Sequence, residues 1–494
     1  MNTPPNPPRV GDPSSPPRLS DATLRDIRPP TDVPLYARSD TRIGIVHIGP
    51  GAFHRAHQAA YVDSLLQTDP RWAISALSLK STGVRDALTP QDGLYTLYEL
   101  AAEPRLRVIG AIREVLVSTT DRAAAFSRLV SGDTRMVTLT VTEKGYCLDA
   151  HGALDATHPD ILHDWQSPQE PQSIFGWLCE ALRRRRSASL PPFTVVSCDN
   201  LADNGKLLHA ALIAFAQRTD RELARWIDGE VVFPRTMVDS ITPATDAALR
   251  SKVAAGTGVS DAWPVQRETF TQWVIEDLPA MHSADWRSVG VTLASDVSAY
   301  ERAKLRLLNG AHSTLAYVGS LLGHETVNEA MNDADLSRFV ARMMREDIAP
   351  LAARNLDVAS YIDAVLSRFA NPGVRHLLSQ IAWDGSKKLP VRILGTVTDA
   401  LAAGRRIDRL LIPIAAWMHF IARQARAGVA IVDPEATRLS AIGTACTGDV
   451  DHDVGLFTTV GMIPEVLMRD EVFGKALRAA YVQMKQPLAA IKML

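Results

Sequence analysis

The chain has 494 residues, of which 46% are hydrophobic and 22% charged, values typical of a globular protein with two or three domains. Its formal net charge of -2 argues against a nucleic-acid-binding protein, which usually carries a clear basic excess. The apolar run at residues 410–422 contains a proline and a histidine and is too short to span a bilayer, so we expect no membrane partner.

The four cysteines stand far apart, and no two have the spacing of a zinc or redox motif. We therefore expect no metal site and buried thiols in a reducing cytoplasm. No signal peptide is expected, because no apolar segment of suitable length follows a basic start. Ten prolines fall within the first 34 residues and predict a flexible, proline-rich lead-in over residues 1–40.

Strands and helices alternate from residue 42 onward, which predicts a parallel sheet covered by helices. The expected strands cover residues 43–48, 72–79, 106–109, 136–141, 193–197 and 231–233. The expected helices cover residues 52–66, 122–130, 174–186 and 205–217.

Strand patterns nearly vanish after residue 300, and helical periodicity dominates the rest of the chain. The expected helices there cover residues 299–322, 336–346, 374–381 and 409–427. The fold class is thus an α/β domain of the Rossmann type at residues 41–295, followed by a mostly α-helical domain at residues 296–494.

A glycine turn, Gly49-Pro50-Gly51, follows the first strand directly and precedes a helix. Glycines let the backbone approach a pyrophosphate, and a helix N-terminus favours its charge. An ordinary turn between a strand and a helix fits the same residues. The second expected strand ends without the acidic residue that binds the ribose of NAD, and Lys80 could accommodate a 2′-phosphate, so NAD and NADP both remain open.

Three polar side chains, Lys304, Asn309 and His312, fall within an arc of about 140° on a regular helix among apolar neighbours. A desolvated lysine has a lowered pKa and can exchange a proton with a hydroxyl group. Asn309 can stabilise an oxygen that develops negative charge, and His312 can orient a hydroxyl. By the pattern alone, a surface lysine beside a structural asparagine and histidine is the simpler interpretation.

Further polar residues follow strands or gather on helices of the second half. Asn200 and Asp239 stand at expected strand ends, where ligands bind in doubly wound sheets, although both residue types are also common in turns. Arg375 offers a planar group for a carboxylate and Lys388 offers a point charge, although both also fit solvated helix ends.

Two segments together resemble the polyol-specific long-chain dehydrogenases, the mannitol dehydrogenase family. They are His47-Ile-Gly49-Pro-Gly51-Ala-Phe53-His54-Arg55-Ala-His57-Gln58 and Lys304-x4-Asn309-x2-His312. The resemblance implies a metal-independent, often monomeric enzyme that transfers hydride to or from a nicotinamide cofactor in an active site between its two domains. It matches the catalytic lysine to Lys304, the oxyanion-hole asparagines to Asn309 and Asn200, and the substrate-binding residues to His312, Asp239 and Lys388. We expect the cofactor, NAD with NADP not excluded, to contact Gly49, Gly51, Ala52 and Phe53.

Within that family the chain resembles the fructuronate reductases at residues 142–146, which include Lys144, at Arg375-His376, and at Gln380-Ile-Ala-x-Asp384-Gly-Ser-x-Lys388-Leu-Pro390-x-Arg392. It has Gln380 where mannitol dehydrogenases tend to have arginine. Lys144 and Arg375 are cations that could receive a carboxylate, with His376 beside them. Residues 98–100 and 261–265 look more like the mannitol branch. We therefore expect a sugar-acid substrate, D-fructuronate, with a neutral ketose or polyol as the alternative.

Other classes of dehydrogenase fit less well. A zinc-dependent alcohol dehydrogenase needs clustered Cys and His ligands, which the scattered cysteines do not provide. A short-chain dehydrogenase needs a Tyr-x-x-x-Lys spacing, which we do not find in the α/β half.

Overall fold

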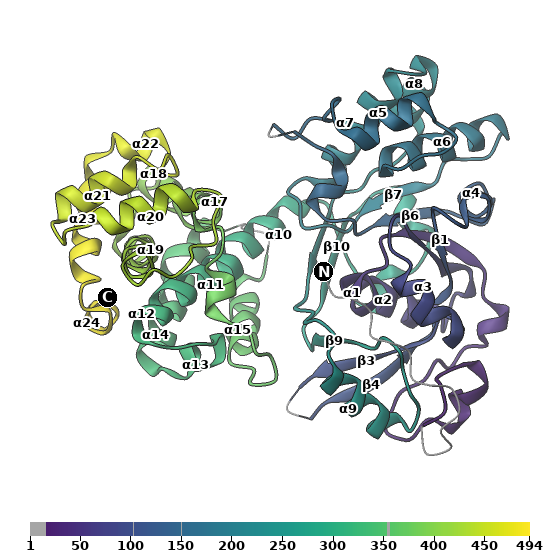
Figure 1. Ribbon diagram of the computed structural model, residues 1–494, viewed down its shortest axis with the longest axis horizontal. Helices are drawn as coiled ribbons and strands as arrows, with labels where there is room; N and C mark the ends of the chain where they lie inside the picture. Colours follow the sequence, from purple (N-terminus) through teal and green to yellow (C-terminus); the bar gives the residue numbers. More distant parts are fainter. Residues whose placement is uncertain (1–15, 102, 150, 353–355) are drawn as a thin grey trace. The chain divides into compact units, whose positions relative to one another are not determined.

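The computed structural model describes residues 16–101, 103–149, 151–352 and 356–494 and divides into two compact units, Met1–Ser298 and Ala299–Leu494 (Figure 1). The first unit is α/β and the second is helical, as the sequence predicts. None of the helices in the described ranges is long and apolar enough to cross a membrane. All four cysteines are buried and free.

A five-stranded parallel sheet forms the centre of the first unit, in the order β5-β2-β1-β6-β7. Its strands are β1 (Ile43–Ile48), β2 (Ala73–Ser78), β5 (Ile112–Val117), β6 (Met136–Leu139) and β7 (Thr194–Ser197). This is the order of a dinucleotide-binding half-sheet, which reverses direction between β1 and β6. The carboxyl ends of β1 and β6 therefore mark the place where such sheets bind ligands.

Helices cover both faces of this sheet, because its strands are apolar on both sides. Ile45 of β1 packs in one core with α2, and Val46 packs in a second core with α4 and α6. The helices of the unit are α1 (Ala52–Ala56), α2 (Gln58–Leu65), α3 (Gly83–Leu88), α4 (Arg122–Leu129), α5 (Pro159–Gln166), α6 (Ile174–Ser187), α7 (Asn204–Gln217), α8 (Arg221–Glu230) and α9 (Ala247–Thr257).

Two three-stranded sheets complete the first unit, in the orders β4-β3-β9 and β11-β10-β8. Their strands are β3 (Tyr95–Leu100), β4 (Arg105–Ile109), β8 (Thr236–Asp239), β9 (Val265–Glu268), β10 (Gln272–Glu276) and β11 (Thr292–Ala294).

The second unit is built around two long buried helical stretches. The first runs from Val297 to Leu322 and contains two π-helical segments, Lys304–Asn309 and Leu315–Gly319. The second is α19 (Asp408–Arg426). The α-helical parts of the first stretch are α10 (Val297–Ala303), α11 (Gly310–Thr314) and α12 (Ser320–Leu322). The remaining helices are α13 (Val327–Asn332), α14 (Ala334–Arg342), α15 (Val358–Phe369), α16 (Leu378–Ile381), α17 (Gly385–Leu389), α18 (Gly395–Ala402), α20 (Ala436–Ala445), α21 (Val450–Thr458), α22 (Glu465–Met468), α23 (Glu471–Gln483) and α24 (Pro487–Met493).

Four sequence expectations differ from the structure. Residues 231–233 form no strand, since Pro234 cannot donate to a ladder and the next strand starts at Thr236. The helix expected at 52–66 breaks at His57, and the helix expected at 374–381 covers only Leu378–Ile381. The flexible lead-in is shorter than predicted, because Leu19 is fully buried and Arg38 is 6% exposed. Residues 1–15 lie outside the described ranges.

Candidate active site

The turn after β1 is fitted closely to the end of β6. Gly49 has φ +91°, a conformation that L side chains rarely adopt, and a Cβ there would lie 2.3 Å from the backbone oxygen of Thr140. The Thr140 hydroxyl donates to the Gly49 oxygen at 2.7 Å. Glycine is therefore required at position 49 both by the backbone conformation and by the neighbouring strand.

Gly51, the next glycine of this turn, faces open space instead. It is the N-cap of α1 at φ −69°, and a Cβ there would meet nothing closer than the Gly49 oxygen at 3.9 Å. No side chain caps the first turn of α1, which begins with the half-buried Ala52 and Phe53. The backbone amides of this first turn, which no side chain caps, lie beside open space and suit the pyrophosphate of a dinucleotide.

Two stacked histidines support the glycine turn from inside the sheet. The His47 ring lies within hydrogen-bonding distance of the Thr138 hydroxyl at 2.7 Å and the Thr140 hydroxyl at 2.9 Å. It stacks on His54 of α1 with ring centroids 3.3 Å apart. Burial lowers the pKa of His47 to about 3 and that of His54 well below the usual value. Both rings are thus neutral at physiological pH.

This burial predicts a loss of stability in acid. The pKa of His47 is lower in the folded protein than in the unfolded chain, so its contribution is present above pH 6.5 and is lost as pH falls toward 3. At pH 5 the free energy of unfolding is expected to be about 2 kcal/mol lower than at pH 7 because of His47. Urea unfolding at the two pH values measures this difference, and His47→Gln should make it smaller by about 2 kcal/mol. An unchanged difference in His47→Gln would contradict the lowered pKa of His47.

Polar groups gather where β6 and β7 end. Asp199 accepts hydrogen bonds from the amides of Val141 and Thr142 at 3.0 and 2.9 Å and from the Tyr146 hydroxyl at 2.9 Å. The carboxylate therefore fixes the loop after β6, which carries the exposed Lys144. Asn200 follows Asp199 directly and is exposed.

Asp239 and Lys80 lie at two other strand ends of the same unit. Asp239 is the last residue of β8 and is 6% exposed. Lys80, just after β2, is exposed and ion-paired with Asp160 at 3.0 Å. A 2′-phosphate at Lys80 would have to compete with that carboxylate.

In the second unit, Lys304, Asn309 and His312 follow one another along a helix that is π-helical from Lys304 to Asn309. The expected arc assumed a regular α-helix. An i→i+5 helix turns less per residue, so the three side chains are spaced differently around this segment. π-Helical segments are frequent at functional sites. Lys304 and Asn309 are half-buried, and His312 is 7% exposed.

The buried His312 and the partly buried His376 form a pair of imidazoles with open nitrogens. Their rings are 5.2 Å apart, and Phe369 packs 4.4 Å from His312. Nε2 of His312 and Nδ1 of His376 are buried and have no hydrogen-bond partner in the described structure. Burial lowers the pKa of both histidines, that of His312 well below the usual value. Unsatisfied buried nitrogens are costly and indicate a ligand with hydroxyl groups.

Lys388 acts on the His376 ring of this pair, whereas the side chain of Arg375, the chain neighbour of His376, is exposed. Lys388 Nζ donates to the Ile381 oxygen at 3.4 Å, and burial, followed by the charge of Arg392, lowers its pKa. Arg375 is 75% exposed and lies 4.0 Å from the equally exposed Glu325. The structure thus brings together His312, His376 and Lys388, and adds Arg392, to which sequence reasoning gave no role.

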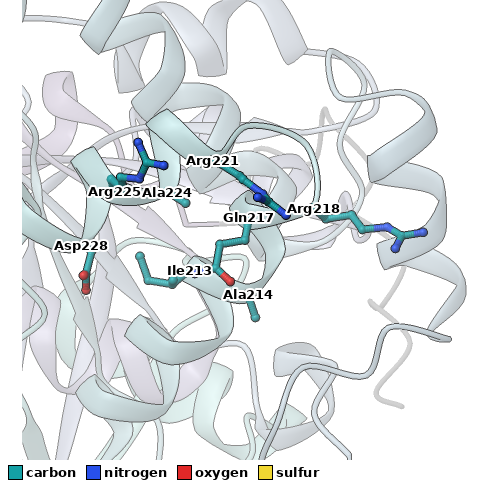
Figure 2. A pocket seen from close by; sticks show the side chains of 8 residues that line it. All are labelled: Ile213, Ala214, Gln217, Arg218, Arg221, Ala224, Arg225 and Asp228. Carbon is teal, nitrogen blue, oxygen red and sulfur yellow. The ribbon is translucent and has the colours of Figure 1, made fainter.

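The described residues also contain a surface hollow of about 520 Å³ between α7 and α8, lined by Ile213, Ala214, Gln217, Arg218, Arg221, Ala224, Arg225 and Asp228. Figure 2 shows the Arg218 guanidinium extended away from the other labelled side chains. None of the residues expected in the site lines this hollow. No group of three or more His, Cys, Asp or Glu side chains that could hold a metal occurs in the described ranges.

Comparison with known proteins connects both units to one family. The mannitol dehydrogenase Rossmann domain matches residues 43–288, and the mannitol dehydrogenase C-terminal domain matches residues 296–490. The chain is 38% identical to D-mannonate oxidoreductase of Escherichia coli (strain K12), covering 94% of this chain and 97% of that protein. It is 37% identical to mannitol 2-dehydrogenase of Aspergillus fumigatus, covering 91% and 92%.

Solved structures agree with these matches. The ternary complex of Pseudomonas fluorescens mannitol 2-dehydrogenase with NAD and D-mannitol has a TM-score of 0.80 at 36% identity, covering 96% of this chain and 99% of that one. D-sorbitol dehydrogenase in substrate-free form has a TM-score of 0.89 at 31% identity, covering 96% and 100%. The chain therefore belongs to the mannitol dehydrogenase family and is an oxidoreductase that acts on CH–OH groups.

Proposed function

We propose that the protein interconverts D-fructuronate and D-mannonate with NAD(H), without a metal ion, in the cytoplasm. The observation that carries this proposal is the polar cluster of His312, His376 and Lys388. Its open imidazole nitrogens suit a polyhydroxylated chain, and the ammonium of Lys388 suits an acid. The similarity to D-mannonate oxidoreductase over 94% of the chain supports the same choice.

The glycine turn fits the cofactor, since Gly51 leaves space and the first turn of α1 lacks a side-chain cap. Gly49, Gly51, Ala52 and Phe53 would hold the pyrophosphate. The bound nicotinamide supplies hydride in the reduction and accepts it in the oxidation. No acidic residue follows β2, so the preference for NAD over NADP rests on family likeness and on the Lys80–Asp160 ion pair.

Lys304 acts as the proton-transfer residue in this proposal. In the reduction its ammonium gives a proton to the oxygen of the substrate carbonyl, and in the oxidation its amine takes the hydroxyl proton. Asn309 and Asn200 donate hydrogen bonds to the oxygen as negative charge develops there. Preorganised amide donors of this kind stabilise an alkoxide without reorganisation during the reaction.

The remaining polar residues bind the substrate. His312 and His376 are neutral, so each ring has one nitrogen that accepts and one that donates a hydrogen bond to a hydroxyl group. Asp239 accepts from a hydroxyl, and Lys388 donates. Lys144 and Arg375 are exposed cations that attract an acid, an effect that salt screens.

The segments that look like the mannitol branch have structural roles. Asp261 is 6% exposed and accepts from the amides of Thr96 at 2.5 Å and Trp263 at 2.9 Å. Glu99 is ion-paired with Arg267 at 2.6 Å across β3 and β9. These contacts stabilise the β4-β3-β9 sheet, so the residues that make them do not distinguish an acid substrate from a neutral one. Mannitol 2-dehydrogenase activity remains the second candidate, because several relatives carry that name.

The test is a product analysis with chelator-treated protein. Purified enzyme is incubated with EDTA, then with D-fructuronate and either NADH or NADPH, and the product is identified by NMR. We expect D-mannonate, formed faster with NADH and at the same rate with or without EDTA. Formation of another product, or loss of activity that added metal restores, would contradict the proposal.

A further inference from the structure

We propose that Arg392 hydrogen-bonds the carboxylate of the substrate and thereby selects a sugar acid over a neutral ketose. This inference rests on the proposed function and names the residue responsible for its substrate class. Arg392 lies in the π-helical segment Pro390–Leu394, four residues after Lys388.

A hydrogen bond ties Arg392 to the helix that carries the candidate site. Its Nη1 donates to the Ser313 hydroxyl at 3.1 Å, and Ser313 directly follows His312 on α11. Arg392 thus bonds the residue next to His312 and stands four residues after Lys388. Its charge also contributes, after burial, to the lowered pKa of both groups. One substrate could therefore contact all three side chains of the second unit.

The charge of Arg392 has no carboxylate partner among the residues that the structure describes. Its side chain is partly buried, and Ser313, its hydrogen-bond partner, is neutral. Other partly buried arginines of this unit differ, since Arg306 pairs with Asp399 at 2.6 Å and Arg409 pairs with Asp347 at 2.8 Å. Desolvation of an uncompensated charge is costly, and a bound anion offsets that cost.

The acids that act on Lys388, Asp384 and Asp433, do not fill this role. Asp433 accepts from the amide and hydroxyl of Ser386 at 2.9 and 2.5 Å. Neither Asp384 nor Asp433 is among the charges that shift the pKa of Arg392, whereas both act on the pKa of Lys388. The guanidinium of Arg392 keeps further donors in the planar arrangement that matches a carboxylate.

Arg392 and Arg375 are expected to contribute differently. The exposed Arg375 attracts an acid over a distance, and high salt weakens that attraction. The hydrogen bond from the partly buried Arg392 is screened much less. The affinity for the acid that is lost on removing Arg392 should therefore be lost at high salt as well as at low salt.

The experiment compares wild type with Arg392→Met, Arg392→Lys and the control Arg409→Met, an arginine of the same unit that has its own carboxylates. A charge-assisted hydrogen bond is worth about 10- to 150-fold in affinity. We expect Arg392→Met to raise KM for D-fructuronate by that factor at both low and high salt, with kcat changed only a few-fold. Arg392→Lys should raise KM for D-fructuronate less than Arg392→Met does. Kinetics with D-fructose should change little, and Arg409→Met should keep the wild-type KM.

A binding measurement separates this inference from the proposed function. Calorimetric titration of the NAD-bound protein with D-mannonate and D-mannitol gives affinities without turnover. If wild type reduces D-fructuronate and the Arg392 variants keep its KM and the D-mannonate affinity, Arg392 has no such role and the proposed function stands. If wild type does not reduce D-fructuronate, the proposed function fails, and D-mannonate binding that depends on Arg392 still supports the inference. Should Arg392→Met not fold, Arg392→Lys decides alone, because wild-type KM in that variant excludes a planar two-bond contact.

Discussion

Replacing Lys304 with alanine is expected to lower kcat about 10²–10⁴-fold, the usual contribution of a positioned proton donor. Alanine cannot give a proton to the carbonyl oxygen, so the reduction must draw that proton from water. The glycine turn lies in the other unit, and we expect the affinity for NADH to stay within a few-fold of wild type. Stopped-flow NADH oxidation and fluorescence titration of NADH measure the two effects.

Lys475→Ala is the matched control for that experiment, because Lys475 is an 81% exposed lysine of the same unit whose partner is Glu471 at 3.5 Å. It should keep wild-type kcat. Near-normal turnover of Lys304→Ala would contradict the proposal that Lys304 transfers the proton. A loss of NADH binding equal to the loss of turnover would show that the variant is misfolded rather than catalytically impaired.

Replacing Gly49 with alanine is expected to have the largest structural effect. The new Cβ would lie 2.3 Å from the Thr140 oxygen, at a backbone φ of +91° that alanine tolerates poorly. Strain and overpacking each cost about 1–3 kcal/mol, so we expect unfolding at clearly lower urea concentration and a loss of NADH binding. Urea unfolding and NADH titration provide the readouts.

Gly51→Ala separates stability from binding at the same turn. Its Cβ has no neighbour closer than 3.9 Å and φ is −69°, so we expect wild-type stability. The methyl group would occupy the space assigned to the pyrophosphate, and we expect the affinity for NADH to fall at least about tenfold, since close backbone approach is lost. Wild-type NADH affinity in Gly51→Ala would place the phosphates elsewhere.

Local patterns were sufficient to predict the strand–turn–helix unit and four of the five strands of the central sheet, whereas β5 was missed and the strand expected at residues 106–109 belongs to the β4-β3-β9 sheet. The apolar residues of β1 and the two glycines after it define that element by themselves, and the predicted strand and observed strand share both ends. The break at His57 was missed, because it depends on packing between distant segments, such as the contact of its ring with Trp273. Strands β3 and β9 were also missed, since each mixes polar and apolar residues and is stabilised by pairing with a partner far along the chain.

In the candidate site, too, residues that are close in sequence were found from the sequence, and residues defined by tertiary contacts were not. Lys304, Asn309 and His312 were selected from the sequence because they are close together and match a family motif. Arg392 entered only as the last residue of a segment that resembles the reductases, since its partial burial and its lack of a carboxylate partner among the described residues are visible only in the structure. The sequence favoured Arg375 as the residue for a carboxylate, and the structure places it in an exposed pair with Glu325.

The most direct test of the account compares NADH oxidation by the purified protein with D-fructuronate and with D-fructose under the same conditions. We expect a kcat/KM for D-fructuronate that exceeds the value for D-fructose by at least the 10- to 150-fold expected from one charge-assisted hydrogen bond. Equal values, or a preference for D-fructose, would contradict it and would make the protein a dehydrogenase of neutral ketoses and polyols.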